Sequence, residues 1–269
     1  MNIRHDFHLH SAFSGDSDTD ASLMAERALS LSLGGICFTE HQDIDAPCEE
    51  PDFTVDFPAY FERINALRAE YRGRLQIGCG IEFGMQPHLA EALPALTAQW
   101  PFDFVIASLH YINGKDPYYP AYFEGRDEQS CYEEFFAAEL EMLKRFSDYD
   151  TLGHMDYIVR YGPNRNRFYT YETYGDFIDP ILRHLITNGK CLEVNTGGYK
   201  YGLGEPNPSV SVLRRYRELG GELLTIGSDA HEPQYLGYDF QKTEAMLREL
   251  GFRYYTIFEG RRPQQINLE

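Results

Sequence analysis

The sequence predicts an α/β fold: a single-domain, TIM-like barrel of parallel strands covered by helices, spanning residues 1–269. Short apolar runs alternate with longer amphipathic segments along the chain, which is typical of βα units. The runs are apolar almost throughout, as in strands that are buried on both faces of a parallel sheet. No segment rich in Pro and Ser divides the chain, so we expect one domain.

Seven apolar runs are the expected strands, and an expected helix follows each of them. The strands are expected near residues 3–10, 35–39, 75–83, 102–110, 151–154, 191–195 and 223–228. The helices are expected near residues 21–33, 58–71, 86–97, 131–146, 171–188, 209–218 and 241–250. Pro58 suits the first turn of its helix, where a backbone N–H has no partner within the helix. Gly189 is a typical helix end.

The number of strands and the closure of the sheet stay open at this point. A run near residues 254–258 is a candidate eighth strand. The alternative architecture is an open doubly wound sheet, but the sequence lacks the Gly-rich dinucleotide motif of many such proteins. A closed barrel is therefore the preferred prediction.

Composition and charge limit the partners that we expect. Of all residues, 43% are hydrophobic and 25% are charged, an ordinary globular balance. The formal net charge of -18 repels phosphate backbones and anionic lipid, so neither a nucleic-acid polymer nor a membrane is expected as a partner. The polar amino terminus is unlike a signal peptide, and no apolar run approaches the roughly 18 residues of a membrane span. We therefore expect a cytoplasmic protein, and the sequence does not indicate its oligomeric state.

The five cysteines lie far apart and form no CxxC pair. This spacing predicts neither a disulfide framework nor a zinc-ribbon site. Cys37, Cys79 and Cys191 fall within expected strands, so we predict that they are small core residues.

Histidines gather at one end of the expected strands. Six of the nine come at or just after the end of a strand, as do two acidic residues: His8, His10, His41, His110, His154, His231, Glu82 and Asp229. The carboxyl ends of the strands of a parallel barrel converge on one face, so these side chains should meet there. If these side chains were only packed in the core, many of their polar groups would lack hydrogen-bond partners. Imidazole with carboxylate suits zinc, iron and manganese better than calcium or magnesium.

Spacing supports the same cluster. His8 and His10 are two residues apart in a strand, so both point to one side of the sheet, and Asp229 and His231 repeat that spacing. Some members have alternatives, because His41 could contact substrate instead, and His110 and His154 could be ordinary buried histidines. Asp16, in the first loop, could be a helix cap, and Glu40 is expected to orient a ligand. His5, His88 and His184 are expected to have packing or surface roles.

The motifs around these residues resemble those of the PHP family, the polymerase-and-histidinol-phosphatase hydrolases. They are Asp6-Phe7-His8-Leu9-His10-Ser11, Thr39-Glu40-His41, Gly80-Ile81-Glu82-Phe83-Gly84, Ser108-Leu109-His110, Gly153-His154-Met155-Asp156 and Gly227-Ser228-Asp229-Ala230-His231. The resemblance runs from residue 6 to residue 231. It implies a distorted (β/α)7 barrel, a single metallohydrolase domain over residues 1–269 and a centre of three divalent metal ions (zinc, iron or manganese).

The resemblance also implies which residues hold each metal. One metal would be held by His8, His10, Glu82 and Asp229, a second by Glu82, His110 and His154, and the third by Asp16, His41 and His231. In some relatives a histidine stands where Asp16 stands here, so the third site departs from the family pattern.

Within the family, the length of the chain and the segment Glu193-Val194-Asn195-Thr196-Gly197-Gly198 most resemble stand-alone histidinol-phosphate phosphatases. The implied activity is hydrolysis of L-histidinol phosphate to L-histidinol and phosphate in histidine biosynthesis. One alternative is a PHP-type phosphoesterase that acts on nucleotides or phosphotyrosine. A second is an amidohydrolase-like C–N hydrolase, although no lysine stands at a strand end to bridge metals. A third is a metal-binding domain without activity. Such a domain would be expected to have lost some of its metal ligands, whereas this sequence retains the whole set.

Phosphate monoesters resist hydrolysis because the dianion repels nucleophiles, and clustered cations remove this difficulty. We expect a metal-bridging hydroxide as nucleophile, at the two metals that share Glu82. Asp229 or His231 would protonate the leaving group. Arg160 and Lys200, in loops after strands, are the expected phosphate clamps. The loops near residues 42–56, 111–130 and 156–170 are expected pocket walls, and their candidates for the organic end of the substrate are Asp43, Asp45, Asp116 and Tyr161.

Overall fold

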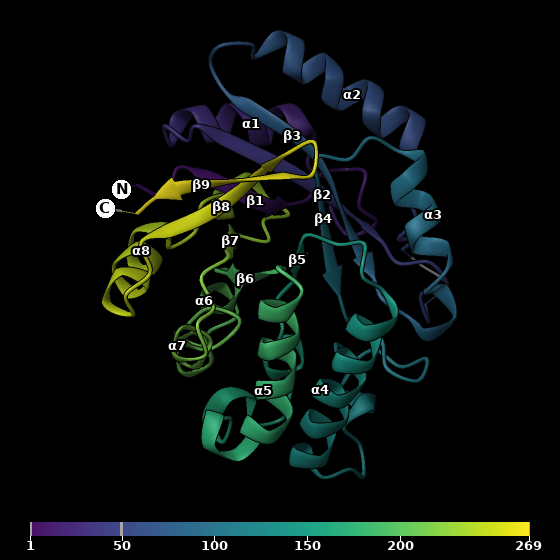
Figure 1. Ribbon diagram of the computed structural model, residues 1–269. Coiled ribbons are helices and arrows are strands. Elements are labelled where there is room, and N and C mark those ends of the chain that lie inside the picture. Colours follow the sequence, from purple (N-terminus) through teal and green to yellow (C-terminus); the bar gives the residue numbers. More distant parts are fainter. Residues whose placement is uncertain (1, 49–50, 269) are drawn as a thin grey trace.

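The computed structural model describes residues 2–48 and 51–268 of the chain. Seven of its strands form one parallel sheet in chain order (Figure 1). They are β1 (His5–Leu9), β2 (Gly35–Gln42), β3 (Gln76–Gly84), β4 (Phe104–Ser108), β5 (Thr151–Leu152), β6 (Cys191–Asn195) and β7 (Leu224–Gly227). The residues after β7 return to β1, where Asp229 N donates to His8 O at 2.7 Å and His10 N donates to Ala230 O at 2.9 Å. The sheet is therefore a nearly closed barrel, and the predicted seven-stranded TIM-like fold is confirmed.

Helices connect the strands and cover the outside of the sheet (Figure 1). They are α1 (Ala21–Ser30), α2 (Phe57–Glu70), α3 (Ala92–Gln99), α4 (Glu128–Arg145), α5 (Tyr171–Thr187), α6 (Gly197–Lys200), α7 (Val210–Glu218) and α8 (Phe240–Glu249). Short 3-10 helices lie in the loops: η1 (Pro87–Leu89), η2 (Pro120–Tyr122), η3 (Tyr157–Arg160), η4 (Arg165–Arg167) and η5 (Pro233–Tyr235).

Side-chain caps explain where several helices begin. Asp20, Asp56, Asp127 and Thr170 each accept a hydrogen bond from a backbone N–H in the first turn of α1, α2, α4 and α5, respectively. Pro58 lies in the first turn of α2, as predicted. The expected helix near residues 86–97 is instead divided into η1 and α3, so that prediction was wrong in its extent.

The core lies between the sheet and its helices. Phe38, Phe83 and Phe104 on the strands and Phe135 on α4 are fully buried. Each such side chain stabilises the fold by about 1.5–3 kcal/mol through apolar burial. The predicted core cysteines Cys37, Cys79 and Cys191 are buried as well. Among the described residues, no helix has the length and apolar character needed to cross a membrane.

The candidate eighth strand near residues 254–258 forms, but it does not join the barrel. β8 (Tyr254–Glu259) pairs antiparallel with β9 (Arg262–Asn267) in a separate hairpin (Figure 1). Its turn residues, Gly260 and Arg261, have φ values of 53° and 63°, as two-residue hairpin turns require. Phe258 packs on Phe104, the first residue of β4, with ring centroids 5.1 Å apart. The hairpin therefore lies at the amino end of β4, and the contact of β1 with the residues after β7 leaves it no edge of the barrel.

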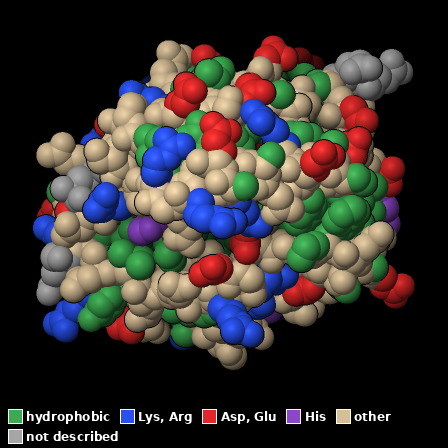
Figure 2. All heavy atoms as spheres, turned by 90° about the horizontal axis from the view of Figure 1, so that it is seen from above, with side chains coloured by type: hydrophobic (Ala, Val, Ile, Leu, Met, Phe, Trp, Pro, Cys, Tyr) green, Lys and Arg blue, Asp and Glu red, His purple; other side chains and the backbone are tan. Residues whose placement is uncertain are grey.

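The excess of acidic residues is not gathered into one patch on the face that Figure 2 shows. Acidic and basic side chains are interspersed there, with apolar side chains between them. This face is seen from above the view of Figure 1.

Candidate metal centre

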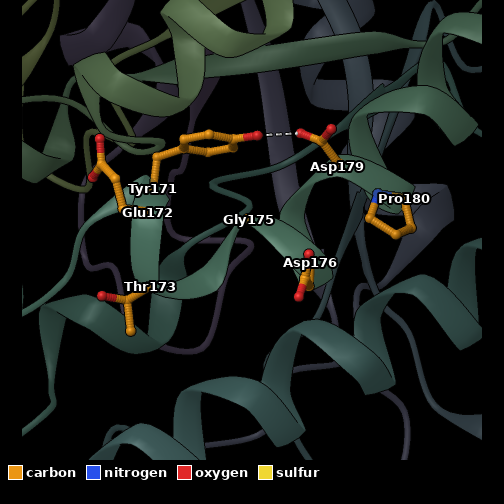
Figure 3. Close-up of a pocket in the computed structure, with 7 residues that line it drawn as sticks. All are labelled: Tyr171, Glu172, Thr173, Gly175, Asp176, Asp179 and Pro180. Carbon is orange, nitrogen blue, oxygen red and sulfur yellow. Dashed lines mark hydrogen bonds between the residues drawn. The ribbon is translucent and has the colours of Figure 1, made fainter.

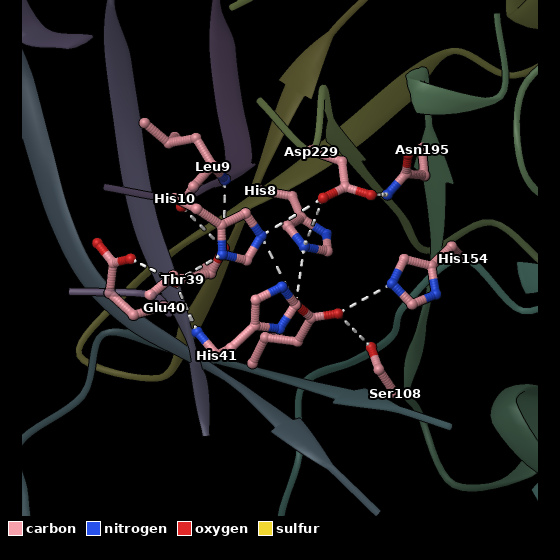
Figure 4. A network of polar contacts seen from close by, with 12 residues as sticks. His8, Leu9, His10, Thr39, Glu40, His41, Ser108, His154, Asn195 and Asp229 are labelled. Carbon is pink, nitrogen blue, oxygen red and sulfur yellow. Dashed lines mark hydrogen bonds and ion pairs between the residues drawn. The ribbon is translucent and has the colours of Figure 1, made fainter. Parts of the chain in front are cut away.

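All nine residues predicted to bind metal lie together at the carboxyl ends of the barrel strands; Figure 4 shows part of this cluster. Five groups have ligand atoms within 4.8 Å of one another: His10, His41 and His231; His8, His10 and Glu82; His8, His154 and Asp229; His41, Asp43 and His110; and Glu82, His110 and His154. Asp16 joins through Oδ2, which lies 3.1 Å from His231 Nε2 and 3.7 Å from His41 Nε2. Metal binding by these residues stays a proposal.

Glu82 lies in the middle of the cluster and is fully buried on β3. Its Oε2 faces one set of imidazoles, with His41 Nδ1 at 3.0 Å and His8 Nε2 at 3.2 Å. Its Oε1 faces the other set, with His154 Nε2 at 2.9 Å and His110 Nε2 at 3.3 Å. The two oxygens of one carboxylate therefore serve two neighbouring groups of histidines.

A third group lies on the open side of Glu82. The His10 ring stacks between those of His41 and His231, with centroids 4.2 Å from each. The Asp16 side chain next to them is 38% exposed, whereas that of Glu82 is 0% exposed. Asp16, on a loop, is thus the least enclosed of the predicted ligands.

The spacing and chemistry of these atoms fit divalent cations. His10 Nε2 is buried without a hydrogen-bond partner in the described part of the chain, and it lies 3.4 Å from Asp229 Oδ1 and 3.6 Å from Glu82 Oε2. Two ligands about 2.1 Å from one tetrahedral zinc ion are themselves roughly 3.4 Å apart. Imidazole and carboxylate are also the ligand types that zinc, iron and manganese prefer. The separations between these ligand atoms therefore suit a metal ion bound between the side chains better than direct hydrogen bonds between them.

The acids and imidazoles of the cluster shift one another's pKa values. Burial alone would raise the pKa of Glu82, but the positive charges of His8 and His41 hold it well below its usual range. The pKa of Asp229 is also lowered, because His8, His10 and Arg160 outweigh its burial. Burial, together with the charge of His41, lowers the pKa of His10 to about 3. The acids are thus ionised and His10 is neutral at pH 7, as metal binding requires. Although burial opposes it, the neighbouring acids raise the pKa values of His8, His41 and His110, so each of these imidazoles would lose a proton on binding a metal ion.

A second set of buried side chains holds the candidate ligands in place. Glu193 on β6 has Oε1 2.5 Å from His8 Nδ1, and its Oε2 accepts from His154 N at 2.7 Å. Asp43 Oδ1 lies 2.8 Å from His110 Nδ1. Such partners fix the orientation of an imidazole and raise its basicity. Sequence reasoning missed both roles, although Glu193, a lone charge within an apolar strand, was a usable signal.

Glu40 has the orienting role that was expected of it. This buried carboxylate accepts from Ser11 N and Ser11 Oγ at 2.9 and 2.6 Å, and from Ser14 Oγ at 2.7 Å. Ser14 Oγ in turn lies 3.0 Å from His10 Nδ1. Glu40 therefore positions His10 through a serine and is not itself part of the cluster.

The predicted phosphate clamps both line the cavity above the cluster, which has a volume of about 430 Å³. Arg160 is only 3% exposed and donates to Asp229 Oδ2, Asn195 Oδ1 and Asn207 Oδ1 at 2.8–2.9 Å. Lys200 Nζ lies 4.3 Å from the centre of the Tyr235 ring. Phosphate binding by either residue stays a prediction, and the two asparagines that fix Arg160 were not predicted.

All three predicted loops supply walls of this cavity. A second hollow lies at the beginning of α5 (Figure 3). There Tyr171 Oη donates to Asp179 Oδ1 at 2.9 Å, and Arg215 binds both oxygens of Asp179. Because its lining residues include no histidine or cysteine, this hollow offers no comparable metal site.

Comparison with known proteins agrees with this geometry. The PHP domain model matches residues 6–197. The chain belongs to the PHP family. Its relatives in that family include histidinol-phosphatase of Lactococcus lactis subsp. lactis (strain IL1403), 31% identical over 95% of this chain and 94% of the relative. A probable histidinol-phosphatase of Clostridium acetobutylicum is 30% identical over 92% of this chain and 94% of the relative.

Solved structures extend the PHP comparison to the whole fold. A crystal structure of histidinol phosphate phosphatase from Lactococcus lactis subsp. lactis Il1403, complexed with Zn, L-histidinol and phosphate, superposes with a TM-score of 0.91. It is 30% identical and covers 97% of this chain and 99% of the solved one. The putative histidinol phosphatase of Listeria monocytogenes superposes with a TM-score of 0.76 at 20% identity, over 88% of this chain and 99% of the other, and supports the fold alone.

Proposed function

We propose that this PHP-family protein is a metal-dependent phosphomonoesterase that hydrolyses L-histidinol phosphate to L-histidinol and phosphate. The Lactococcus relative, similar over nearly the whole chain, supports this substrate, since its structure contains Zn, L-histidinol and phosphate. The relatives do not favour the nucleotide, phosphotyrosine or C–N hydrolase alternatives. A role in histidine biosynthesis follows from this substrate, whereas the cytoplasmic location and the lack of a nucleic-acid partner stay predictions.

The observation that carries the proposal is the environment of Glu82. One fully buried carboxylate has each oxygen within 3.3 Å of a different pair of imidazoles. A carboxylate so placed suits a bridge between two divalent cations, a common arrangement in phosphatases.

The residues that would hold the ions follow from the three groups. His8, His10 and Asp229 would share one ion with Glu82, and His110 and His154 would share a second. Asp16, His41 and His231 would hold a third, and the number of ions stays a prediction. Bound divalent cations lower the pKa of a water molecule and draw charge from the phosphoryl oxygens.

The protein's own side chains would then position the ester. The Arg160 guanidinium is fixed by three acceptors and needs little reorganisation to receive a phosphoryl oxygen. Lys200 adds a second positive charge on the same cavity. Of the two expected proton donors, Asp229 uses Oδ2 for Arg160 and Asn195, so its Oδ1, which lies 3.4 Å from His10 Nε2, is the oxygen that would face the shared ion. Whether Asp229 or His231 protonates the departing alkoxide stays a prediction.

The proposal is tested with purified protein whose metal content is measured by mass spectrometry. Initial rates are compared for histidinol phosphate, a nucleoside monophosphate, phosphotyrosine and dihydroorotate. We expect the highest kcat/KM on histidinol phosphate, loss of activity with a chelator and recovery with Zn²⁺ or Mn²⁺. Preference for dihydroorotate would overturn the phosphatase assignment. Bound metal without turnover of any of the four would indicate a binding domain.

A further inference from the structure

The cavity above the cluster has one wall that the phosphatase chemistry leaves without a role. Arg160 and Lys200 are suited to phosphate, but Asp116 and several tyrosines line the same cavity. A role for this wall rests on the proposed function, because histidinol phosphate carries a protonated primary amine on the carbon next to its ester-bearing carbon, and an imidazole at the end away from phosphorus. A substrate with a dianionic phosphoryl group and a positive ammonium group is matched by a pocket that offers both a cationic and an anionic side chain.

Most acidic residues near this cavity are already engaged. Asp16 and Asp229 belong to the candidate metal centre. Asp43 has Oδ1 2.8 Å from His110 Nδ1 and Oδ2 3.4 Å from His41 Nδ1. Asp45, a candidate from the sequence, is not among the residues that line the cavity and pairs with His88 at 3.0 Å. Glu232 is exposed at the rim and accepts from Gln234 at 3.0 Å.

Asp116 has a different environment. Its Oδ1 accepts from Tyr118 N at 2.7 Å, which fixes the carboxylate against the loop. Its Oδ2 has no hydrogen-bond or ion-pair partner among residues 2–48 and 51–268. Partial burial raises the pKa of Asp116 to about 6, so ionising it without a partner costs free energy. A cation that reached Oδ2 would remove that cost.

Aromatic rings connect Asp116 with the phosphate side of the cavity. The ring of Tyr118 lies 5.2 Å from that of Tyr161, which lies 5.7 Å from that of Tyr201. The Arg160 guanidinium lies over Tyr201, 4.9 Å from the ring centre. A continuous aromatic surface therefore leads from the open carboxylate to the buried guanidinium. Such a surface suits a flat imidazole, through ring stacking or cation–π contact.

We propose that Asp116 is a specificity-determining residue that accepts a hydrogen bond from the substrate ammonium group, while the imidazole lies against Tyr118 and Tyr161. The phosphoryl group then lies at the Arg160 end of the same cavity. The ester is recognised by its negative phosphoryl group and its positive ammonium group, and phosphate esters without an amine do not use the Asp116 contact.

The test compares Asp116→Asn with the wild-type metal-loaded protein on three esters. They are histidinol phosphate, the analogue that lacks only the amino group, and p-nitrophenyl phosphate. Asparagine can still accept the bond from Tyr118 N but has no negative charge for an ammonium ion. We expect kcat/KM on histidinol phosphate to fall about 10- to 100-fold, mainly through KM. Rates on the other two esters should stay within twofold.

Product inhibition gives a second, independent measurement. Inhibition by L-histidinol should weaken in Asp116→Asn by a similar factor, whereas inhibition by inorganic phosphate should not change. Glu124→Gln is the matched control, because Glu124 is exposed on the same loop and does not line the cavity. Glu232→Gln tests the other acid at the rim.

Three outcomes would overturn the inference. They are an equal loss on all three esters, no loss on histidinol phosphate, or a selective loss in Glu232→Gln instead of Asp116→Asn. A wild-type protein inactive on histidinol phosphate would overturn both this inference and the proposed function. An active wild type with an unaffected Asp116→Asn variant would overturn only the inference.

Discussion

Glu82→Gln removes one negative charge from the middle of the histidine cluster while keeping the size of the side chain. In the wild-type protein Oε1 also accepts a hydrogen bond from Ser108 Oγ at 2.7 Å. Glutamine can keep that bond through its carbonyl oxygen, but its NH₂ group then points at His8 and His41 in place of Oε2. An NH₂ group has no lone pair for a cation, so one half of the proposed bridge is lost.

The size of the effect follows from burial. Glu82 is fully buried, so solvent does not replace the missing charge. Removing one partner of a buried charge pair costs about 3–5 kcal/mol. Since 1.4 kcal/mol corresponds to a factor of ten, the affinity for the shared ions should fall by about 10²–10⁴. Activity on histidinol phosphate should fall at least as far, because it depends on those ions.

Metal content after gel filtration and metal affinity by competition with a chelating dye measure this effect directly. Circular dichroism and gel filtration show whether the variant is folded. Glu26→Gln makes the same chemical change at an exposed position on α1 and should alter neither metal content nor rate. A folded Glu82→Gln protein with wild-type metal content and activity would refute the bridging role.

Two further predictions concern buried acids outside the proposed ligand set. Glu193→Gln should weaken metal binding about 10- to 100-fold, because Glu193 orients His8 and His154; unchanged metal affinity would contradict this. Glu139 is buried on α4, its Oε2 has no hydrogen-bond partner among the described residues, and burial with repulsion from Asp156 raises its pKa above 4.5. The folded protein therefore holds this proton more tightly than the unfolded chain. As the pH rises above 4.5, the free energy of unfolding of the wild-type protein should fall by up to about 1.4 kcal/mol per pH unit. The fall should end once the pH exceeds the pKa of Glu139 in the folded protein. Glu139→Gln should remove this dependence, and parallel curves of melting temperature against pH for the two proteins would count against it.

The sequence alone predicted a parallel, helix-covered sheet, with a closed barrel as the preferred form, and the composition of the cluster. The chain alternates continuous apolar runs with amphipathic segments. A parallel sheet covered by helices buries both the apolar runs and the apolar faces of the amphipathic segments. Except for Asp16, which is in the loop after β1, each predicted ligand is in a strand or close to its end, as with Glu82 in β3 and His154 just after β5. In a parallel barrel, position along a strand sets the end of the barrel at which a side chain lies. The convergence of these residues could therefore be predicted without knowing how strands pair.

Only the tertiary structure decided which carboxylate serves which partner. Glu193 and His8 are 185 residues apart, and their 2.5 Å contact depends on how β6 and β1 face each other across the barrel. Asp43 was a candidate for the substrate but holds His110, whereas Oδ2 of Asp116 has no hydrogen-bond partner in the described part of the chain. Likewise, the sequence of β8 resembles that of a barrel strand, but β8 pairs with β9. Spacing along one strand is a local property of the chain, whereas partners across the barrel depend on register and loop paths, which arise only when distant elements pack.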